Sequence, residues 1–412
     1  MSFQSSMMRK KCGFYIGFII LLLRVTYADG QLSNDFSLDK KQFLFASTPE
    51  RSLKATYLKN TIDSLIETKV DPSQDSASWQ GAFWAMQLML YKPEKFLKLI
   101  PSFIQNLSSG SDEYQRSFLE MLYTLYPNDF KKNINKEWRR LSNAKNQAMA
   151  LEYLALNSIQ PNIKRTDKIF QTGWYESYIN RRNKITSVEV MEKDFKDFTF
   201  LPGKVIICSF QSSDRNTPGY AMIRKQDGTW LTDINNLPVK IPQLARSISN
   251  LPYYLTNGNT PQGLFRVTGT DISENKWIGP TTNIQMVLPF ENDHQFFQGS
   301  KDYEVYYKTL LGEKLSKVDA LNEAFYAGKL GRSEIIAHGT TIDPEFYRGQ
   351  KFYPCTPSLG CLCSPEIWDE DGRISYSAQQ QILDALINNN LIPEWLIVAE
   401  ISDFQPPETI KK

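Results

Sequence analysis

Apolar residues between about residues 54 and 157 recur at the spacing of one helical face. The clearest runs are Trp79, Phe83, Met86 and Leu90, and Tyr114, Phe118, Leu122 and Leu125. Segments rich in Ser, Gly, Pro and Asp separate these runs and predict turns. The pattern therefore predicts an all-α domain of short helical hairpins over residues 29–160.

The pattern changes after about residue 161, where short apolar runs bounded by turn residues predict strands. The candidate strands are residues 205–210, 219–224, 264–267, 284–288, 334–337 and 395–401. Helical spacing returns at 315–326 and at 378–388, the second behind the N-cap residue Ser377. We expect a linker at 161–200, a mainly β domain with inserted helices at 201–403, and a C-terminal tail at 404–412.

Composition narrows the class of protein. The chain has 412 residues, 41% of them hydrophobic and 22% charged, with a mean hydropathy of −0.40. These values exclude a disordered chain and a polytopic membrane protein. The net charge is +2, but residues 1–28 supply four positive charges and no negative ones, which leaves −2 for the remainder. We therefore expect no nucleic-acid partner.

The N-terminus has the layout of an export signal. Arg9, Lys10 and Lys11 precede an apolar run at 12–23, and small residues follow before Asp29. This order predicts a signal peptide over residues 1–28, with an uncleaved N-terminal anchor as the alternative. In either case we expect an exported protein of the periplasm or cell envelope.

The candidate chemistry involves one histidine and one cysteine. His338 follows an apolar run and precedes Gly339, so we expect it at a strand end facing a cleft. His294 lies in a polar segment and is interpreted as a solvated loop residue. Cys361 follows Gly360, which allows a sharp turn and close approach of the backbone to a substrate. A thiol whose pKa is lowered by an adjacent imidazole is a competent nucleophile for acyl transfer.

Other interpretations of the cysteines stay open. Cys355, Cys361 and Cys363 could bind zinc with His338, although their spacing is unusual for a zinc site. A Cys355–Cys363 disulfide would suit an exported protein and leave Cys361 free. Cys208, inside an apolar run, is interpreted as a buried hydrophobic residue.

Three motifs together resemble the catalytic domain of the L,D-transpeptidase family. They are Thr260-Pro261-Gln262-Gly263-Leu264-Phe265, His338-Gly339-Thr340 and Ser358-Leu359-Gly360-Cys361, in the family's order. The resemblance covers about residues 201–403. It implies a mainly β fold of the transpeptidase type, a cysteine nucleophile and peptidoglycan stem peptides as substrate.

The resemblance also assigns roles to individual residues. Cys361 is expected to be the nucleophile and His338 its base, with the Gly339 carbonyl fixing the second imidazole nitrogen. The backbone N–H groups of Gly360 and Cys361 are the expected oxyanion donors. Ser358 and Thr340, within these motifs, are expected to contact the substrate. No metal or organic cofactor is expected.

The chain departs from the family pattern at two positions. Leu359 stands where the family usually has histidine, and Cys363 where an arginine is common. Because a stem peptide carries carboxylates, another cation is expected in the cleft. Arg348, within additional residues at about 343–351, is the first candidate, and Arg332 is the second.

The resemblance leaves alternative functions open. Water instead of an amine as acceptor would give L,D-carboxypeptidase-type trimming of stem peptides. A domain of this fold without activity would be a cell-wall-binding module. The helical domain has no catalytic constellation, and we expect it to serve as a scaffold that binds a protein or glycan partner.

Overall fold

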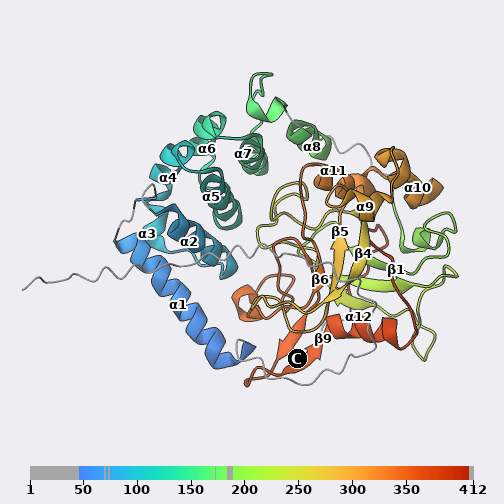
Figure 1. Ribbon diagram of the computed structural model, residues 1–412. Helices are drawn as coiled ribbons and strands as arrows, with labels where there is room; N and C mark the ends of the chain where they lie inside the picture. Colours follow the sequence, from blue (N-terminus) through green and yellow to red (C-terminus); the bar gives the residue numbers. More distant parts are fainter. Residues whose placement is uncertain (1–45, 69–70, 73–74, 172, 183–188, 408–412) are drawn as a thin grey trace, which may run out of the picture.

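The computed structural model describes residues 46–407 except 69–70, 73–74, 172 and 183–188. The predicted signal peptide lies outside the described residues. The chain combines helices with a large mixed sheet, and the helices α1–α8 form a curved array on one side of the sheet (Figure 1). Within the described ranges, no helix is long and apolar enough to cross a membrane.

The helical array comprises α1 (Thr48–Glu67), α2 (Ser76–Leu88), α3 (Glu94–Leu97), α4 (Ile100–Asn106), α5 (Asp112–Leu125), α6 (Lys131–Glu137), α7 (Ala144–Leu156) and α8 (Gly173–Arg182). Polar N-cap side chains begin several of these helices, each accepting a hydrogen bond from a backbone N–H three residues later. These caps are Ser47, Asp75, Ser111 and Asn143. Helix α8 lies in the segment expected to be a linker.

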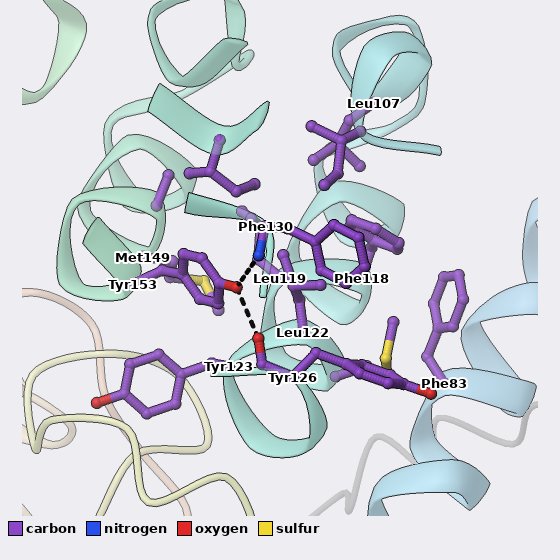
Figure 2. Close-up of a cluster of buried hydrophobic side chains, with 14 of the residues drawn as sticks. Phe83, Leu107, Phe118, Leu119, Leu122, Tyr123, Tyr126, Phe130, Met149 and Tyr153 are labelled. Carbon is purple, nitrogen blue, oxygen red and sulfur yellow. Dashed lines mark hydrogen bonds between the residues drawn. The ribbon is translucent and has the colours of Figure 1, made fainter. Parts of the chain in front are cut away.

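Aromatic side chains fill the core of the helical array. Phe83 and Phe118 are fully buried and contact each other edge to face, with ring centroids 5.4 Å apart. The buried Tyr153 hydroxyl donates to the Tyr126 carbonyl at 2.6 Å and accepts from the Phe130 N–H at 3.0 Å (Figure 2). This hydroxyl therefore satisfies two backbone groups where α5 ends and α6 begins.

The sheet has the strand order β3-β2-β1-β10-β4-β5-β6-β7. Its strands are β1 (Ile206–Gln211), β2 (Gly219–Arg224), β3 (Ile241–Gln243), β4 (Gly263–Asp271), β5 (Asn283–Val287), β6 (Ala337–His338), β7 (Leu362–Cys363) and β10 (Trp395–Glu400). β1 pairs with β10, and β6 with β7, in parallel; the other neighbours are antiparallel. A separate hairpin joins β8 (Glu366–Trp368) and β9 (Ile374–Ser377).

Helices lie between the strands, as the sequence predicts. They are α9 (Asp293–Phe297), α10 (Tyr303–Leu315), α11 (Glu323–Lys329) and α12 (Ala378–Ile387). The prediction of α12 behind Ser377 is confirmed, because the Ser377 side chain accepts from the Gln380 N–H. The prediction of one helix at 315–326 is wrong. Helix α10 ends at Leu315 and α11 begins at Glu323, with a short 3-10 turn between them.

The two ends of the sheet meet, which closes it into a near-barrel. Leu244, which follows β3, exchanges two backbone hydrogen bonds of 2.9 Å with Cys363 of β7. The Ile248 N–H also donates to the Ser358 carbonyl at 2.8 Å. The segment that contains Cys361 is therefore fixed on one side by β6 and on the other by residues 244–248.

A loop at residues 251–259 joins the sheet to the helical array. Leu251, Tyr254 and Leu255 are buried in the same apolar cluster as the aromatic residues of the helices. The Tyr254 hydroxyl donates to the Glu152 carboxylate of α7 at 2.7 Å. The Asn257 amide donates to both carboxylate oxygens of Glu120 in α5, at 3.1 Å each. The two parts of the chain therefore share a core and buried polar contacts.

Replacing Tyr153 with Phe should lower the free energy of unfolding by about 2 to 4 kcal/mol, because a buried N–H and a buried carbonyl each lose their partner. Urea unfolding followed by circular dichroism measures the change. Tyr57→Phe is the control, since Tyr57 is 50% exposed. Equal stability of the two variants would contradict the role given to the Tyr153 hydroxyl.

Candidate functional site

Parallel pairing of β6 with β7 brings the histidine and cysteine motifs together. His338 lies opposite Cys363 in the register, and the Ser364 N–H donates to the His338 carbonyl at 2.8 Å. Cys361 lies immediately before β7, in the turn that also contains Gly360, so the pairing brings the turn with the cysteine next to the strand with the histidine. The prediction of a histidine at a strand end before a glycine is confirmed.

The third motif holds the backbone beside the cysteine. The buried Thr260 hydroxyl donates to the Gly360 carbonyl at 2.8 Å. Gly360 has φ +121°, and a Cβ there would collide with the Arg332 guanidinium and lie 2.7 Å from the Gly258 carbonyl oxygen. Only glycine fits this position. The three motifs that carry the family resemblance therefore meet at one place.

His338 is held in one tautomer. Its Nδ1 lies 2.5 Å from the Gly339 carbonyl oxygen, and since a carbonyl only accepts, Nδ1 carries the proton. Nε2 is then free to accept a proton. Burial lowers the pKa of His338, although the Gly339 carbonyl partly offsets this effect, so the ring is neutral at neutral pH. The structure thus contains the predicted hydrogen bond between the Gly339 carbonyl and the second ring nitrogen of His338.

Glu366 supports this arrangement from behind, and sequence reasoning missed it. Its carboxylate packs against Gly339 and Gly279 so closely that a Cβ at either glycine would collide with it. Oε1 accepts from Thr281 at 2.5 Å and from Ser377 at 2.7 Å, whereas the buried Oε2 has no hydrogen-bond partner among the residues that the structure describes. Burial raises the pKa of Glu366 to about 7 despite these two hydrogen bonds. The sequence offers no signal for this contact, because the two glycines and Glu366 are far apart in the chain.

The Cys361 thiol differs from the expected low-pKa nucleophile. Its sulfur donates to the Glu334 carbonyl at 3.5 Å, and no hydrogen bond to His338 is found among the described residues. Burial raises the pKa of Cys361 to about 11, and the Ile336 N–H and Arg332 offset only part of this shift. The expectation that the imidazole lowers this pKa is therefore wrong, and the thiol is protonated at neutral pH.

The two expected oxyanion donors have different surroundings. The Gly360 N–H donates to the Ser358 hydroxyl at 3.1 Å, and this hydroxyl donates to the Cys361 carbonyl at 2.8 Å. Gly360 is thus not a free donor here, and Ser358 closes the turn instead of facing a ligand. The Cys361 N–H has no hydrogen-bond partner in the part of the chain that the structure describes, and remains the available donor.

The expected substrate cations also differ in position. Arg348 is exposed and its guanidinium binds the Glu345 carboxylate, so the structure does not bring it to Cys361. Arg332 is only 7% exposed and lies against Gly360, close enough to act on the Cys361 thiol. Thr340 is buried, with its hydroxyl donating to the Trp277 carbonyl at 3.2 Å, and therefore contributes to the fold around the site.

The other cysteine interpretations can be compared with the structure. Cys208, Cys355, Cys361 and Cys363 are free thiols, and Cys208 is fully buried as predicted. Over the described ranges, no group of three or more His, Cys, Asp or Glu residues could hold a metal ion. His294 is exposed as expected, but in the first turn of α9 instead of a loop.

Access to the two reactive groups is unequal. Cys361 is partly exposed, whereas His338 is 4% exposed. Two surface hollows, one between α1 and residues 341–346 and one between Thr199 and α10, include neither side chain. The open cleft expected at the cysteine is therefore not one of these hollows.

Alkylation of Cys361 by iodoacetamide should accelerate about tenfold per pH unit from pH 7 to 10, because only the thiolate reacts and its pKa is about 11. Peptide mapping by mass spectrometry separates Cys361 from the buried cysteines. A rate that is already constant between pH 5 and 8 would indicate a preformed thiolate and contradict the structure.

Replacing Glu366 with Gln should make stability less dependent on pH. The folded-state pKa of about 7 lies above the ordinary value of 4.5 for a glutamate, so this contribution to stability is present below about pH 4.5 and is lost as pH rises through about 7. We expect the variant to match the wild type near pH 5 and to be more stable by on the order of 2 to 3 kcal/mol at pH 8. Thermal unfolding at both pH values measures the difference, and a constant difference would refute the assignment.

Comparison with known proteins adds no family or fold assignment. No family model matches the chain. No curated protein and no solved structure matches it either. A function for the site is therefore inferred from its residues and contacts.

Proposed function

We propose that the chain is a peptidoglycan L,D-transpeptidase that acts through a thioester on Cys361. The observation that supports the proposal is the β6–β7 pairing, in which His338 lies opposite Cys363, two residues after Cys361, while the Thr260 hydroxyl binds the Gly360 carbonyl. The one neutral imidazole of the site has its Nδ1 proton on the Gly339 carbonyl, which leaves Nε2 as a base. The predicted export signal supports a location in the periplasm or cell envelope.

In the proposed reaction, the stem peptide displaces the Cys361 thiol from the Glu334 carbonyl. His338 Nε2 takes the thiol proton as the sulfur attacks the carbonyl carbon of the diamino-acid residue. The oxyanion accepts from the Cys361 N–H. Collapse breaks the bond to the terminal D-alanine, whose amine takes the proton from His338, and a thioester remains. An amine of a neighbouring stem then forms the crosslink and restores the thiol, whereas water would give trimming.

The electrostatics of the resting site favour proton transfer during the attack over a preformed ion pair. A neutral histidine and a protonated thiol coexist because burial disfavours both charged forms. The Arg332 guanidinium, adjacent to Gly360, stabilises a thiolate as it forms. Arg332 is also the candidate cation for binding a substrate carboxylate near Cys361.

A second candidate function is a cell-wall-binding module without activity. Two observations favour it. The Cys361 thiol donates its hydrogen bond to the Glu334 carbonyl and not to His338, and the pKa of the thiol is raised. Under this candidate, stem peptides bind without covalent change.

Incubation with a tetrapeptide muropeptide should release D-alanine and add the acyl mass to Cys361, as measured by intact-protein and peptide mass spectrometry. Cys361→Ala should remove the adduct and all turnover, and His338→Gln should lower turnover by at least about a hundredfold. Cys208→Ala is the matched control: it should keep turnover while losing about 1 to 2 kcal/mol of stability through a buried contact.

The outcomes separate the candidates. Dimeric muropeptide indicates transpeptidation, and trimmed tripeptide alone indicates carboxypeptidase activity. Binding without adduct or D-alanine release would support the inactive module and refute the enzyme. Equal loss of turnover in the Cys361 and Cys208 variants at unchanged stability would contradict the assignment of the nucleophile.

A further inference from the structure

Lys145 of α7 is a half-buried cation at the junction of the helices and the sheet. Its ammonium lies 5.6 Å from the Trp174 ring centroid, and no carboxylate lies within ion-pair distance in the described part of the chain. Burial lowers the pKa of Lys145, and Arg116 and Arg332 lower it further, whereas Glu120 and Asp112 raise it. The Trp174 ring beside Lys145 contacts the Tyr254 ring, with centroids 6.1 Å apart, and Arg332 binds the carbonyl of the adjacent Tyr253. Lys145 and Arg332 therefore both border the loop at 251–259.

Arg332 links this group to the nucleophile. Its Nη1 donates to the Tyr253 carbonyl at 2.5 Å and to the Asn259 carbonyl at 3.0 Å, which fixes the guanidinium at both ends of the loop that joins the two parts of the chain. Among the described residues it has no ion-pair partner. Its Nη2 faces Gly360, the residue before Cys361.

The nearby carboxylates are already bound. Glu120 accepts from Arg116 at 2.9 Å and from the Asn257 amide. Hydrogen bonds from Ser142 and Asn143 lower the pKa of Asp112, so they hold it as a carboxylate. Two carboxylates, both already hydrogen-bonded, among three cations leave one positive charge in excess in a largely buried place.

Acidic groups on the thiol side do not remove this excess. Glu291 and Glu334 act on Cys361, but neither forms an ion pair with Lys145 or Arg332 over the residues described. Leaving buried cations uncompensated is costly, so the arrangement favours an anionic ligand.

We propose that Lys145, with Arg116 and Arg332, binds a carboxylate of the substrate, so that the helical array forms part of the binding site next to Cys361. The ligand class is a short peptide with a free carboxylate. The identity of that peptide rests on the proposed function, whereas the anion site itself does not. Lys145 and Arg116 then contribute positive charge from the helical array, whereas the sheet domain has Cys363 where the family that the sequence resembles commonly has an arginine.

The anion site can be tested without peptidoglycan. Cys361 is alkylated with iodoacetate, which carries a carboxylate, and with neutral iodoacetamide, and the ratio of the two rates is measured by peptide mapping. Lys145→Met should lower the iodoacetate-to-iodoacetamide ratio by about threefold to tenfold. The ratio cancels any change in the amount of thiolate, because both reagents need the same thiolate.

Control variants distinguish charge from folding. Lys145→Arg keeps the charge and should keep the ratio within about twofold. Lys136→Met removes an exposed lysine of α6 and should leave the ratio unchanged. A wild-type ratio in Lys145→Met, or an equal loss in Lys145→Arg and Lys145→Met, would refute the anion site.

A second measurement addresses the substrate. In the wild type, the KM for acylation should be lower for a tetrapeptide acid than for its C-terminal amide, and Lys145→Met should reduce this difference at little cost in kcat. If the wild type is never acylated, the proposed function fails, and the alkylation ratio still decides the anion site. If acylation occurs, and Lys145→Met keeps both the wild-type alkylation ratio and the lower KM for the peptide acid, only the anion site fails.

Discussion

Two backbone hydrogen bonds between β6 and β7 fix the geometry on which the site depends. The Leu362 N–H donates to the Ile336 carbonyl, and the Ser364 N–H donates to the His338 carbonyl. They set the register of a very short parallel pair, and a shift of one residue would move the turn that contains Cys361 relative to His338. The Leu244–Cys363 pair and the Thr260–Gly360 contact lock this register from the other side. Four distant segments of the chain thus determine the position of one sulfur atom.

A few buried hydrogen bonds also hold the junction between the helices and the sheet. Tyr254 and Asn257, in the loop at 251–259, donate hydrogen bonds to carboxylates of α7 and α5. The Arg332 guanidinium, which lies against Gly360, donates to two carbonyl groups of the same loop. Because these buried groups satisfy one another, displacement of the helices would leave charges unpaired. The helical array and the Cys361 turn are therefore mechanically connected through one loop.

Local patterns predicted several elements of the fold and the strand-end position of His338, and long-range contacts account for what they missed. The strands at 206–211 and 219–224, the cap at Ser377 and the strand-end His338 all depend on neighbours in sequence. By contrast, the Arg348 ion pair with Glu345, the packing of Glu366 on two glycines and the hydrogen bond of Cys361 to Glu334 depend on the folded chain. The prediction of one helix at 315–326 was wrong because α10 ends at Leu315 and the 3-10 turn at 319–322 separates it from α11.

The raised pKa of the Cys361 thiol has a consequence for the chemical durability of the protein. At pH 7, a pKa of about 11 leaves roughly one molecule in ten thousand as thiolate. The thiolate is the species that attacks peroxides and disulfides, and sulfenic acid formation follows thiolate content and exposure. A resting sulfur held as a thiol against the Glu334 carbonyl is thus slow to oxidise, and its reactivity is kept for the moment when a ligand displaces that hydrogen bond.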